Sequence, residues 1–257
     1  MKKQNRDVEL GIIGGTGLYH LQGAEQLERR RIETPWGEPS SEVVIANVQG
    51  RVVAFMTRHG EKHNIPPHKV NYRANIWALK QCGVKRVIAV AAVGGITDEM
   101  SPQTIAIPDQ IIDYTCARKH TYFEDELEEV THIDFTQPYS ECLREALIQV
   151  AGKESIDIVA AGVYAATQGP RLETAAEIQR LKQDGASIVG MTGMPEAALA
   201  RELELEYACC ALVVNWAAGC AGTTCIEHDE MQKVVDKGMQ GVRTLLQAVI
   251  KHTETAI

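Results

Sequence analysis

Apolar runs of strand length alternate along the chain with segments whose apolar residues recur every three or four positions. The run at 87–93 is continuous in valine, isoleucine and alanine, which is typical of a strand covered by helices on both faces. Strands are predicted at 8–13, 42–46, 51–57, 87–93, 158–164, 188–191 and 207–215, and helices at 70–82, 138–151, 175–184, 195–203 and 229–252. This alternation predicts one α/β domain over residues 1–257, with its core at about 8–252 and a mixed, mostly parallel sheet flanked by helices.

Turn residues and polar segments separate these elements. Gln49 and Gly50 lie between two strand-like runs and predict a hairpin, and Gly83 predicts the C-terminal cap of the preceding helix. Open α/β sheets bind ligands at the carboxyl ends of their strands. Polar segments follow the predicted strands at Thr16, Arg58 and His59, Gly94 and Gly95, Glu173, Thr192, and Asn215. We therefore expect one site that is assembled from six separated segments.

The composition narrows the class of protein. A chain of 257 residues with 45% hydrophobic residues can bury one sizeable core, and its net charge of −8 argues against a general affinity for nucleic acid or anionic membranes. Its 7 cysteines are an odd number without a C-x-x-C pair, so neither a disulfide framework nor a zinc site is expected. The sequence shows no signal peptide and no run of about 18 apolar residues. We expect a cytoplasmic protein.

Two of the polar segments suit an anion. The turn at 14–17, GGTG, offers backbone N–H groups and the Thr16 hydroxyl, although it matches neither G-x-G-x-x-G nor GK[ST] and an ordinary tight turn is the alternative. Arg58 supplies a charged fork for phosphate oxygens, and the adjacent His59 can add a donor. A surface arginine and the RHG motif of the histidine phosphatases are the alternatives here. Two prolines after His63 argue against a metal site that pairs it with His59.

The remaining segments each have a structural alternative. Glu173 precedes a predicted helix and could serve only as its cap, whereas a free carboxylate there could accept a hydrogen bond from a ligand. Thr192 places a hydroxyl before another helix, which is a favourable position for an anion. Asn215 ends an apolar strand, and its amide needs partners from either a turn or a ligand.

Taken together, the segments carry a family resemblance. They are GIIGGTGL at 11–18, TPWG at 34–37, RHG at 58–60, VNYRANIWALK at 70–80, AAVGGI at 91–96, TQGPRLETAAEI at 167–178 and VGMTGMPEAALARE at 189–202. In this order the chain resembles the methylthioadenosine phosphorylase branch of the trimeric purine nucleoside phosphorylases, from residue 11 to about 250. It is most similar to the bacterial S-methyl-5′-thioinosine phosphorylase type.

The resemblance implies a fold, an assembly and a set of site residues. It implies a single-domain nucleoside phosphorylase fold and a homotrimer, with no metal, no organic cofactor, and inorganic phosphate as co-substrate. The implied phosphate-binding residues are Thr16, Arg58, His59, Thr192 and the backbone near Ala92. The implied substrate contacts are Leu172, Glu173, Met191, Asn215, Trp216 and Ala217, and the implied catalytic residues are Asn215, Arg58 and His59. Relatives often carry Thr or Asn where this chain has Ala91, so a side-chain contact from that position is not expected.

The base-facing residues predict which purine is released. Adenine-type members of the family use an Asp-x-Asp pair, whereas this chain has Asn215, Trp216 and Ala217. The Asn215 amide can donate to a 6-keto oxygen and accept a proton at N7, and Glu173 can accept from N1–H, which adenine lacks. We therefore expect a 6-oxopurine nucleoside, with a methylthioadenosine phosphorylase that releases adenine as the nearest alternative. A nucleoside-binding protein without turnover is the alternative from another class.

The 5′ end of the sugar is predicted less sharply. His228 and Met231 are three residues apart at the start of the last helix and share a face. His228 could bind a 5′-hydroxyl, as in inosine and guanosine, whereas Met231 could pack on a methylthio group. The overall similarity favours S-methyl-5′-thioinosine.

Overall fold

A computed structural model describes residues 8–20, 23–125 and 129–252 of the chain. The strands are β1 (Leu10–Gly14), β2 (Glu25–Arg30), β3 (Val43–Val48), β4 (Arg51–Thr57), β5 (Arg86–Gly95), β6 (Ile105–Ala106), β7 (Gln110–Asp113), β8 (Ile158–Val159), β9 (Val163–Ala166), β10 (Ile188–Gly190) and β11 (Glu206–Trp216). The helices are α1 (Tyr72–Gln81), α2 (Glu141–Lys153), α3 (Ala175–Gln183), α4 (Gly193–Glu202) and α5 (His228–His252), with short 3₁₀ turns at Pro67–Lys69 and Cys220–Gly222.

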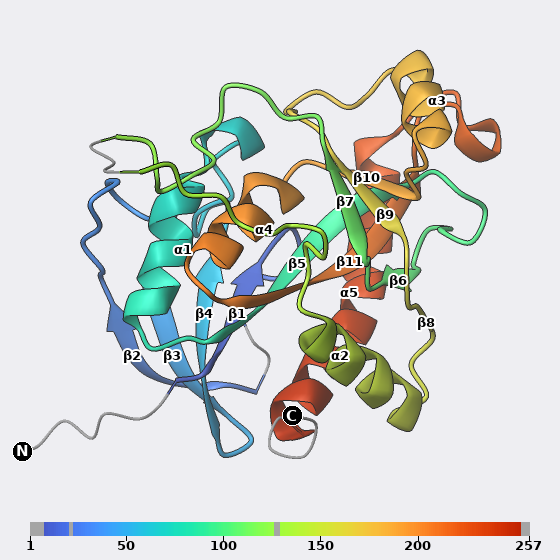
Figure 1. The fold of residues 1–257 in the computed structure, drawn as a ribbon. Helices are drawn as coiled ribbons and strands as arrows, with labels where there is room; N and C mark the ends of the chain where they lie inside the picture. Colours follow the sequence, from blue (N-terminus) through green and yellow to red (C-terminus); the bar gives the residue numbers. More distant parts are fainter. Residues whose placement is uncertain (1–7, 21–22, 126–128, 253–257) are drawn as a thin grey trace, which may run out of the picture.

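One mixed sheet organises the molecule (Figure 1). Its main path runs β2-β3-β4-β1-β5-β10-β9-β7, and β11 pairs with β5 outside this path. The inner pairs β1–β4, β1–β5 and β5–β11 are parallel, whereas β2–β3 and β3–β4 form the antiparallel edge. The predicted α/β fold with a mixed, mostly parallel sheet flanked by helices is confirmed, and so is the hairpin that joins β3 to β4.

Helices cover both faces of the central strands. In β5, Val87 and Ala89 belong to the core cluster that includes α1 and α4, whereas Ile88 and Val90 belong to the cluster that includes α2 and α5. Successive residues of a strand point to opposite faces, so a strand covered on both sides must be apolar at every position. This double coverage explains the continuous apolar run of β5.

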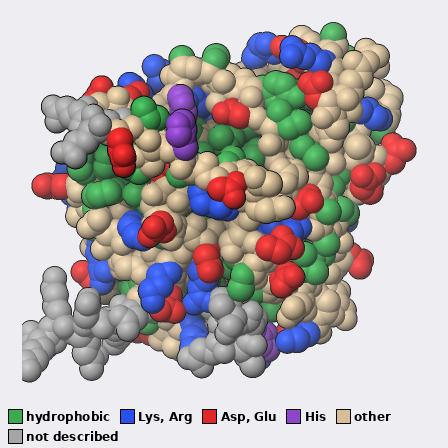
Figure 2. All heavy atoms as spheres, in the orientation of Figure 1, with side chains coloured by type: hydrophobic (Ala, Val, Ile, Leu, Met, Phe, Trp, Pro, Cys, Tyr) green, Lys and Arg blue, Asp and Glu red, His purple; other side chains and the backbone are tan. Residues whose placement is uncertain are grey.

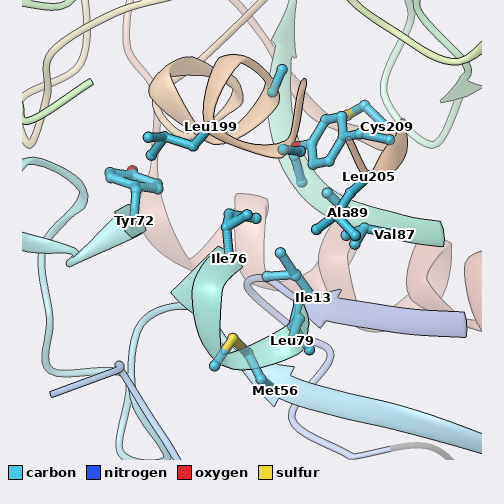
Figure 3. Close-up of a cluster of buried hydrophobic side chains, with 14 of the residues drawn as sticks. Ile13, Met56, Tyr72, Ile76, Leu79, Val87, Ala89, Leu199, Leu205 and Cys209 are labelled. Carbon is cyan, nitrogen blue, oxygen red and sulfur yellow. The ribbon is translucent and has the colours of Figure 1, made fainter. Parts of the chain in front are cut away.

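The packing of α1 on the sheet is visible in a close-up. Figure 3 shows Ile76 and Leu79 of α1 beside Ile13 of β1, with Met56 of β4 next to them and Leu199 of α4 beyond. All five of these side chains are fully buried, and each buried aliphatic side chain contributes about 1.5–3 kcal/mol. The core therefore fixes the strands whose ends carry the candidate site residues.

One predicted strand is wrong, and three strands were not predicted. The run 158–164 is two strands, because the chain turns at Gly162, whose φ is +146° and whose N–H donates to Asp109 Oδ1 at 2.7 Å. The strand before this turn, β8, pairs with β6, whereas the strand after it, β9, pairs with β7 and β10. The pattern also missed β2, β6 and β7. The first of these is a polar, exposed edge strand, and β6 has only two residues.

The surface carries charges of both signs. Figure 2 shows Lys and Arg side chains interspersed with Asp and Glu side chains over this face of the molecule. Within the described residues, no helix is long and apolar enough to span a bilayer.

Candidate active site

A cavity of about 410 Å³ lies where several strands end, and most of the predicted site residues line it. Its volume falls within the range of small-molecule sites. The predicted residues in its wall are Thr16, Arg58, His59, Ala92, Leu172, Glu173, Met191, Thr192, Asn215, Ala217 and Met231. Trp216 is not among the residues that line it. His228 begins α5, and its side chain lies outside the described part of the chain.

The sheet brings these residues together in a way that differs from the sequence-based expectation. Thr16 and Arg58 follow the ends of the parallel strands β1 and β4, as predicted. In contrast, β10 runs antiparallel to β5, with Val189 opposite Gly94, so the turn after β10 leads back along β5. Gly94 lies inside β5 and Asn215 inside β11, where the register shifts between Val213 and Asn215. Such a bulge redirects the side chains that follow it.

Arg58 forms a buried ion pair that the sequence did not predict. Its Nε and Nη2 each donate to one carboxylate oxygen of Glu196 at 2.7 Å, and Glu196 also accepts from the Tyr207 hydroxyl at 2.8 Å. Arg58 is 1% exposed and Glu196 is fully buried. Burial disfavours the charged guanidinium, but the charge and hydrogen bonds of Glu196 outweigh it and raise the pKa of Arg58 above its usual range. Arg58 is therefore charged at every working pH.

The Nε–Nη2 edge of the Arg58 guanidinium is bound to Glu196, so a phosphate would meet the remaining N–H groups. Nη1 donates to the Val90 carbonyl at 2.9 Å, which leaves one N–H on Nη1 and one on Nη2 for a ligand. Gly15 lets the β1 turn approach this group closely, because a Cβ there would lie 2.6 Å from the Val90 oxygen and 3.1 Å from Nη1. The turn and the guanidinium thus form one compact wall of the cavity.

His59 is a neutral hydrogen-bond acceptor toward the cavity. Its Nδ1 lies 2.9 Å from the Ile65 carbonyl, which can only accept, so Nδ1 carries the proton. Burial and then the charge of Arg58 lower the pKa of His59 to about 4. Its Nε2 is consequently unprotonated at neutral pH and can accept from a phosphate hydroxyl or a sugar hydroxyl. His59 thus presents an acceptor here, whereas its expected role as a donor to phosphate stays a prediction.

The threonines and alanines supply the uncharged part of the same wall. Thr192 is the N-cap residue of α4, and its side chain makes no capping hydrogen bond. Thr16 lies in the turn closed by the Leu18 N–H and the Gly15 carbonyl. Both hydroxyls border the cavity. The methyl group at Ala91 leaves only backbone groups on that part of β5.

Glu173 and Asn215 are each oriented by a neighbour. The Thr167 hydroxyl donates to Glu173 Oε1 at 2.6 Å, which leaves Oε2 to accept from a ligand. Asn215 Nδ2 donates to the Trp216 carbonyl at 2.7 Å, so one N–H and the Oδ1 acceptor remain. Glu173 is half-buried in the loop between β9 and α3. An acceptor and a donor–acceptor pair therefore border the same cavity.

The rest of the cavity wall is apolar. Met231 and Val235 of α5 and Ile226 before it border the cavity, and a Cβ on Gly17 would lie 2.5 Å from a Val235 methyl carbon. This apolar wall is therefore next to the Thr16 turn. Met191 and Leu172 contribute further apolar surface, and Leu172 is 44% exposed.

Sequence reasoning missed Glu196 and Thr167, which bind and orient side chains that border the cavity. Glu196 carried a signal, because it is a charged residue within the apolar segment that begins α4. Thr167 had none, since its role depends on a loop that folds back to bring Glu173 beside it. Within the described residues, no group of three or more His, Cys, Asp or Glu side chains is placed to hold a metal.

Comparison with known proteins defines the class. The family described as "Phosphorylase superfamily" matches residues 9–251. A probable S-methyl-5′-thioinosine phosphorylase of Pseudomonas syringae pv. tomato is 55% identical over 239 residues, which cover 93% of this chain and 97% of the relative. A 6-oxopurine nucleoside phosphorylase of Pyrococcus furiosus is 44% identical and covers 94% of this chain and 91% of the relative. Methylthioadenosine phosphorylase from Schistosoma mansoni, solved with adenine, has a TM-score of 0.92 at 31% identity and covers 96% and 92% of the two chains.

The chain therefore belongs to the phosphorylase superfamily. It is an enzyme of the nucleoside phosphorylase type, which transfers a pentosyl group to phosphate. The resemblance seen in the sequence is confirmed. The alternative that the RHG segment marks a histidine phosphatase is excluded. The phosphorylase family match includes this segment, and the chain shares its fold with a nucleoside phosphorylase.

Proposed function

We propose that this enzyme cleaves S-methyl-5′-thioinosine with inorganic phosphate, releasing hypoxanthine and 5-methylthioribose 1-phosphate, with inosine and guanosine as poorer substrates. The observation that carries the proposal is a single cavity with an anion-binding wall at Thr16, Arg58 and Thr192 and a purine-reading pair, Glu173 and Asn215, across from it. The order of bond changes follows from this arrangement.

At the anion-binding wall, the two threonine hydroxyls and the free N–H groups of Arg58 hold phosphate below the sugar. A phosphate oxygen attacks the anomeric carbon while the bond from that carbon to the purine breaks. The electron pair of that bond leaves with the purine, and the ribosyl group gains positive charge that the bound phosphate stabilises. His59 accepts a hydrogen bond from the phosphate hydroxyl, which orients the attacking oxygen.

At the base end, Asn215 and Glu173 select the leaving group. The departing purine takes a proton at N7 from water, which is balanced by the proton that the phosphate hydroxyl releases to water as the sugar phosphate forms. Asn215 Oδ1 accepts a hydrogen bond from that N7–H while its free N–H donates to the 6-keto oxygen. Glu173 Oε2 accepts from N1–H of hypoxanthine. Adenine offers an acceptor at N1, so it would face the carboxylate unpaired, at a cost of about 1–3 kcal/mol.

The apolar wall supports a methylthio group at the 5′ position. Met231, Val235 and Ile226 offer no polar partner for a hydroxyl, whereas they can pack on a thioether methyl group. The relatives with 50% identity or more support the same choice, because those of P. syringae and Xanthomonas campestris are named probable S-methyl-5′-thioinosine phosphorylases. The adenine-releasing alternative has its support in a structural neighbour of only 31% identity.

The wider setting belongs to the same proposal. We propose a homotrimer that works in purine salvage in the cytoplasm as one domain. Inorganic phosphate is its co-substrate, and it has neither a metal nor an organic cofactor. All 7 cysteines are free thiols, which supports a reducing compartment. Sedimentation of the purified protein tests the trimer.

The decisive experiment follows base release by chromatography with and without phosphate. Methylthioinosine, inosine, methylthioadenosine and adenosine are offered in parallel to the wild type and to Asn215→Asp. The wild type is expected to release hypoxanthine from methylthioinosine only when phosphate is present. The new carboxylate can accept from a 6-amino group, so the variant is expected to gain activity on adenine nucleosides relative to the wild type.

A matched variant separates this effect from added charge. Asn64 borders the cavity from the His59 segment, so Asn64→Asp adds the same charge away from the purine-reading pair. It should leave the base preference unchanged. Release of adenine by the wild type would contradict the roles of Glu173 and Asn215, and base release that does not need phosphate would contradict phosphorolysis itself.

A further inference from the structure

Arg118 is a buried arginine that the proposed reaction does not use. It lies after β7, is 8% exposed and does not line the cavity. All three of its guanidinium nitrogens donate hydrogen bonds. Nε donates to Gln168 Oε1 at 3.0 Å, Nη2 to the carbonyls of Thr167 and Gln168 at 3.1 and 2.8 Å, and Nη1 to the carbonyls of Met191 and Met194 at 2.8 and 2.6 Å.

These partners belong to two different parts of the site. The Thr167–Gln168 backbone begins the loop that carries Glu173, and the Thr167 hydroxyl itself orients that carboxylate. The turn from Met191 to Met194 carries Thr192, which belongs to the anion-binding wall of the cavity. Arg118 therefore joins the base end of the cavity to its phosphate end through one planar group.

The two turns are also in direct contact. Gly169 has a φ of +61°, and a Cβ there would lie 2.4 Å from Met191 Sδ. The two turns touch at this point, and their separation depends on the carbonyl groups that accept hydrogen bonds from Arg118. Four carbonyl oxygens converge on this guanidinium, and without it they would lose their shared donor in a largely buried position.

Arg118 and Arg58 differ in whether a carboxylate neutralises their charge. Among the described residues, no carboxylate oxygen lies within ion-pair distance of Arg118, and its remaining contact is with Tyr72, whose hydroxyl accepts at 3.3 Å and whose ring lies 5.5 Å from the guanidinium carbon. Arg58, in contrast, is neutralised by Glu196. A buried cation whose partners are backbone dipoles fixes those dipoles in one arrangement.

We propose that Arg118 is a positioning residue, which sets the spacing between the purine-reading loop and the phosphate-binding turn. The inference rests on the proposed function. Its loss should weaken the use of phosphate and of nucleoside together, because both turns depend on the same group. A displacement of about 1 Å at a reacting centre costs about a hundred-fold in rate, so kcat/KM for both substrates should fall by that order in Arg118→Met.

Arg144 provides a matched control. It is 4% exposed and donates to the carbonyls of Pro108, Ile107 and Ala160, none of which belongs to a turn of the cavity. The experiment measures kcat and KM for phosphate and for methylthioinosine, together with the melting temperature, in Lys and Met variants of both arginines. All four variants should melt earlier than the wild type. Only the Arg118 variants should lose kcat/KM, and Arg118→Lys should retain more than Arg118→Met because an ammonium still reaches some of the carbonyls.

Each outcome decides between the two proposals. Arg118 variants with wild-type KM values and kcat, melting as the Arg144 variants do, would overturn the positioning role. If the wild type releases no base, the proposed function fails. The role of Arg118 is then tested by the shift in melting temperature that phosphate and hypoxanthine cause in the wild type and in each variant. Loss of that shift in the Arg118 variants alone would support the role. A shift that persists in them, or is absent from the wild type, would overturn it.

Discussion

The two ends of the cavity are built in different ways. At the phosphate end, Arg58 and Glu196 are almost completely buried and stand on a strand end and a helix held by the core. At the base end, Glu173 lies on a loop beside Leu172, which is 44% exposed, and its partner is a single hydroxyl. The phosphate end is part of the folded core, whereas at the base end Asn215 belongs to the core strand β11 and Glu173 stands on a loop attached to it.

This difference suggests where specificity can change without loss of the fold. A change at the buried pair disturbs folding and phosphate binding together, because an unpaired charge in the core is costly. A change of a loop side chain that faces the purine leaves the buried pair in place. The fold is shared at a TM-score of 0.92 with a protein solved with adenine, and a 44% identical relative is named a 6-oxopurine nucleoside phosphorylase.

The largest effect is expected at the buried pair. Glu196→Gln removes the charge that neutralises Arg58, so the free energy of unfolding should fall by about 3–5 kcal/mol, as measured by urea denaturation. Glu177→Gln is the control, because Glu177 binds Arg171 with both oxygens but at the surface. Its cost should stay below about 1 kcal/mol. Equal losses in the two variants would remove the distinction between a core-built end and a surface loop.

A second effect concerns pH and His59. Its folded pKa of about 4 lies below the ordinary histidine pKa of about 6.5, so the unfolded state binds more protons between these pH values. Stability should therefore fall as the pH drops from about 6.5 to about 4, by roughly 2–3 kcal/mol for this group. Chemical denaturation over this range compares the wild type with His59→Gln, whose curve should be flatter. Parallel curves would show that His59 is not held neutral by burial.

A smaller effect is expected at the base end. Thr167→Val removes the hydroxyl that orients Glu173, and kcat/KM for methylthioinosine should fall by about ten-fold, which corresponds to one hydrogen bond to a charged group. Thr97→Val is the control, because the buried Thr97 hydroxyl has no hydrogen-bond partner within the described structure. Its kinetics should not change. A normal kcat/KM in Thr167→Val would show that Glu173 is oriented by the ligand alone.

The smallest effect sharpens the description of the sugar end. Met231→Gln places an amide in the apolar wall, so the preference for methylthioinosine over inosine should fall by about ten-fold or less. Met231→Leu keeps the wall apolar at similar volume and should retain the preference. The ratio of the two kcat/KM values is the measurement. A ratio that is unchanged in the glutamine variant would place the 5′ group elsewhere.

Much of the fold could be predicted from the sequence, because many elements are marked by patterns of neighbouring residues. The run in β5 is apolar at every position because two helical layers cover it, and Gly83, with a φ of +94°, ends α1 as a cap. The missed elements depend on distant contacts. The strand predicted over 158–164 is divided because Gly162 bonds to Asp109, a partner 53 positions away that no local pattern reveals.

The same limit applies to the site. Residues that follow strands, such as Thr16 and Arg58, could be located because the sheet gathers strand ends. The partners of Arg58 and Glu173 could not, since Glu196 lies 138 positions from Arg58 and Thr167 meets Glu173 only when the loop closes. The sequence therefore predicted which residues border the cavity, and the structure shows which residues orient them.

The most direct test of this account is the ratio of kcat/KM for methylthioinosine to that for methylthioadenosine, measured in the wild type, Glu173→Gln and Thr192→Val. The glutamine amide can donate to N1 of adenine, so Glu173→Gln should lower the ratio by about 10- to 100-fold. Thr192→Val should reduce both kcat/KM values alike and leave the ratio unchanged, because the hydroxyl meets phosphate with either nucleoside. A wild type that prefers methylthioadenosine, or a ratio that Thr192→Val alters as much as Glu173→Gln does, would contradict the division into a phosphate end and a base end.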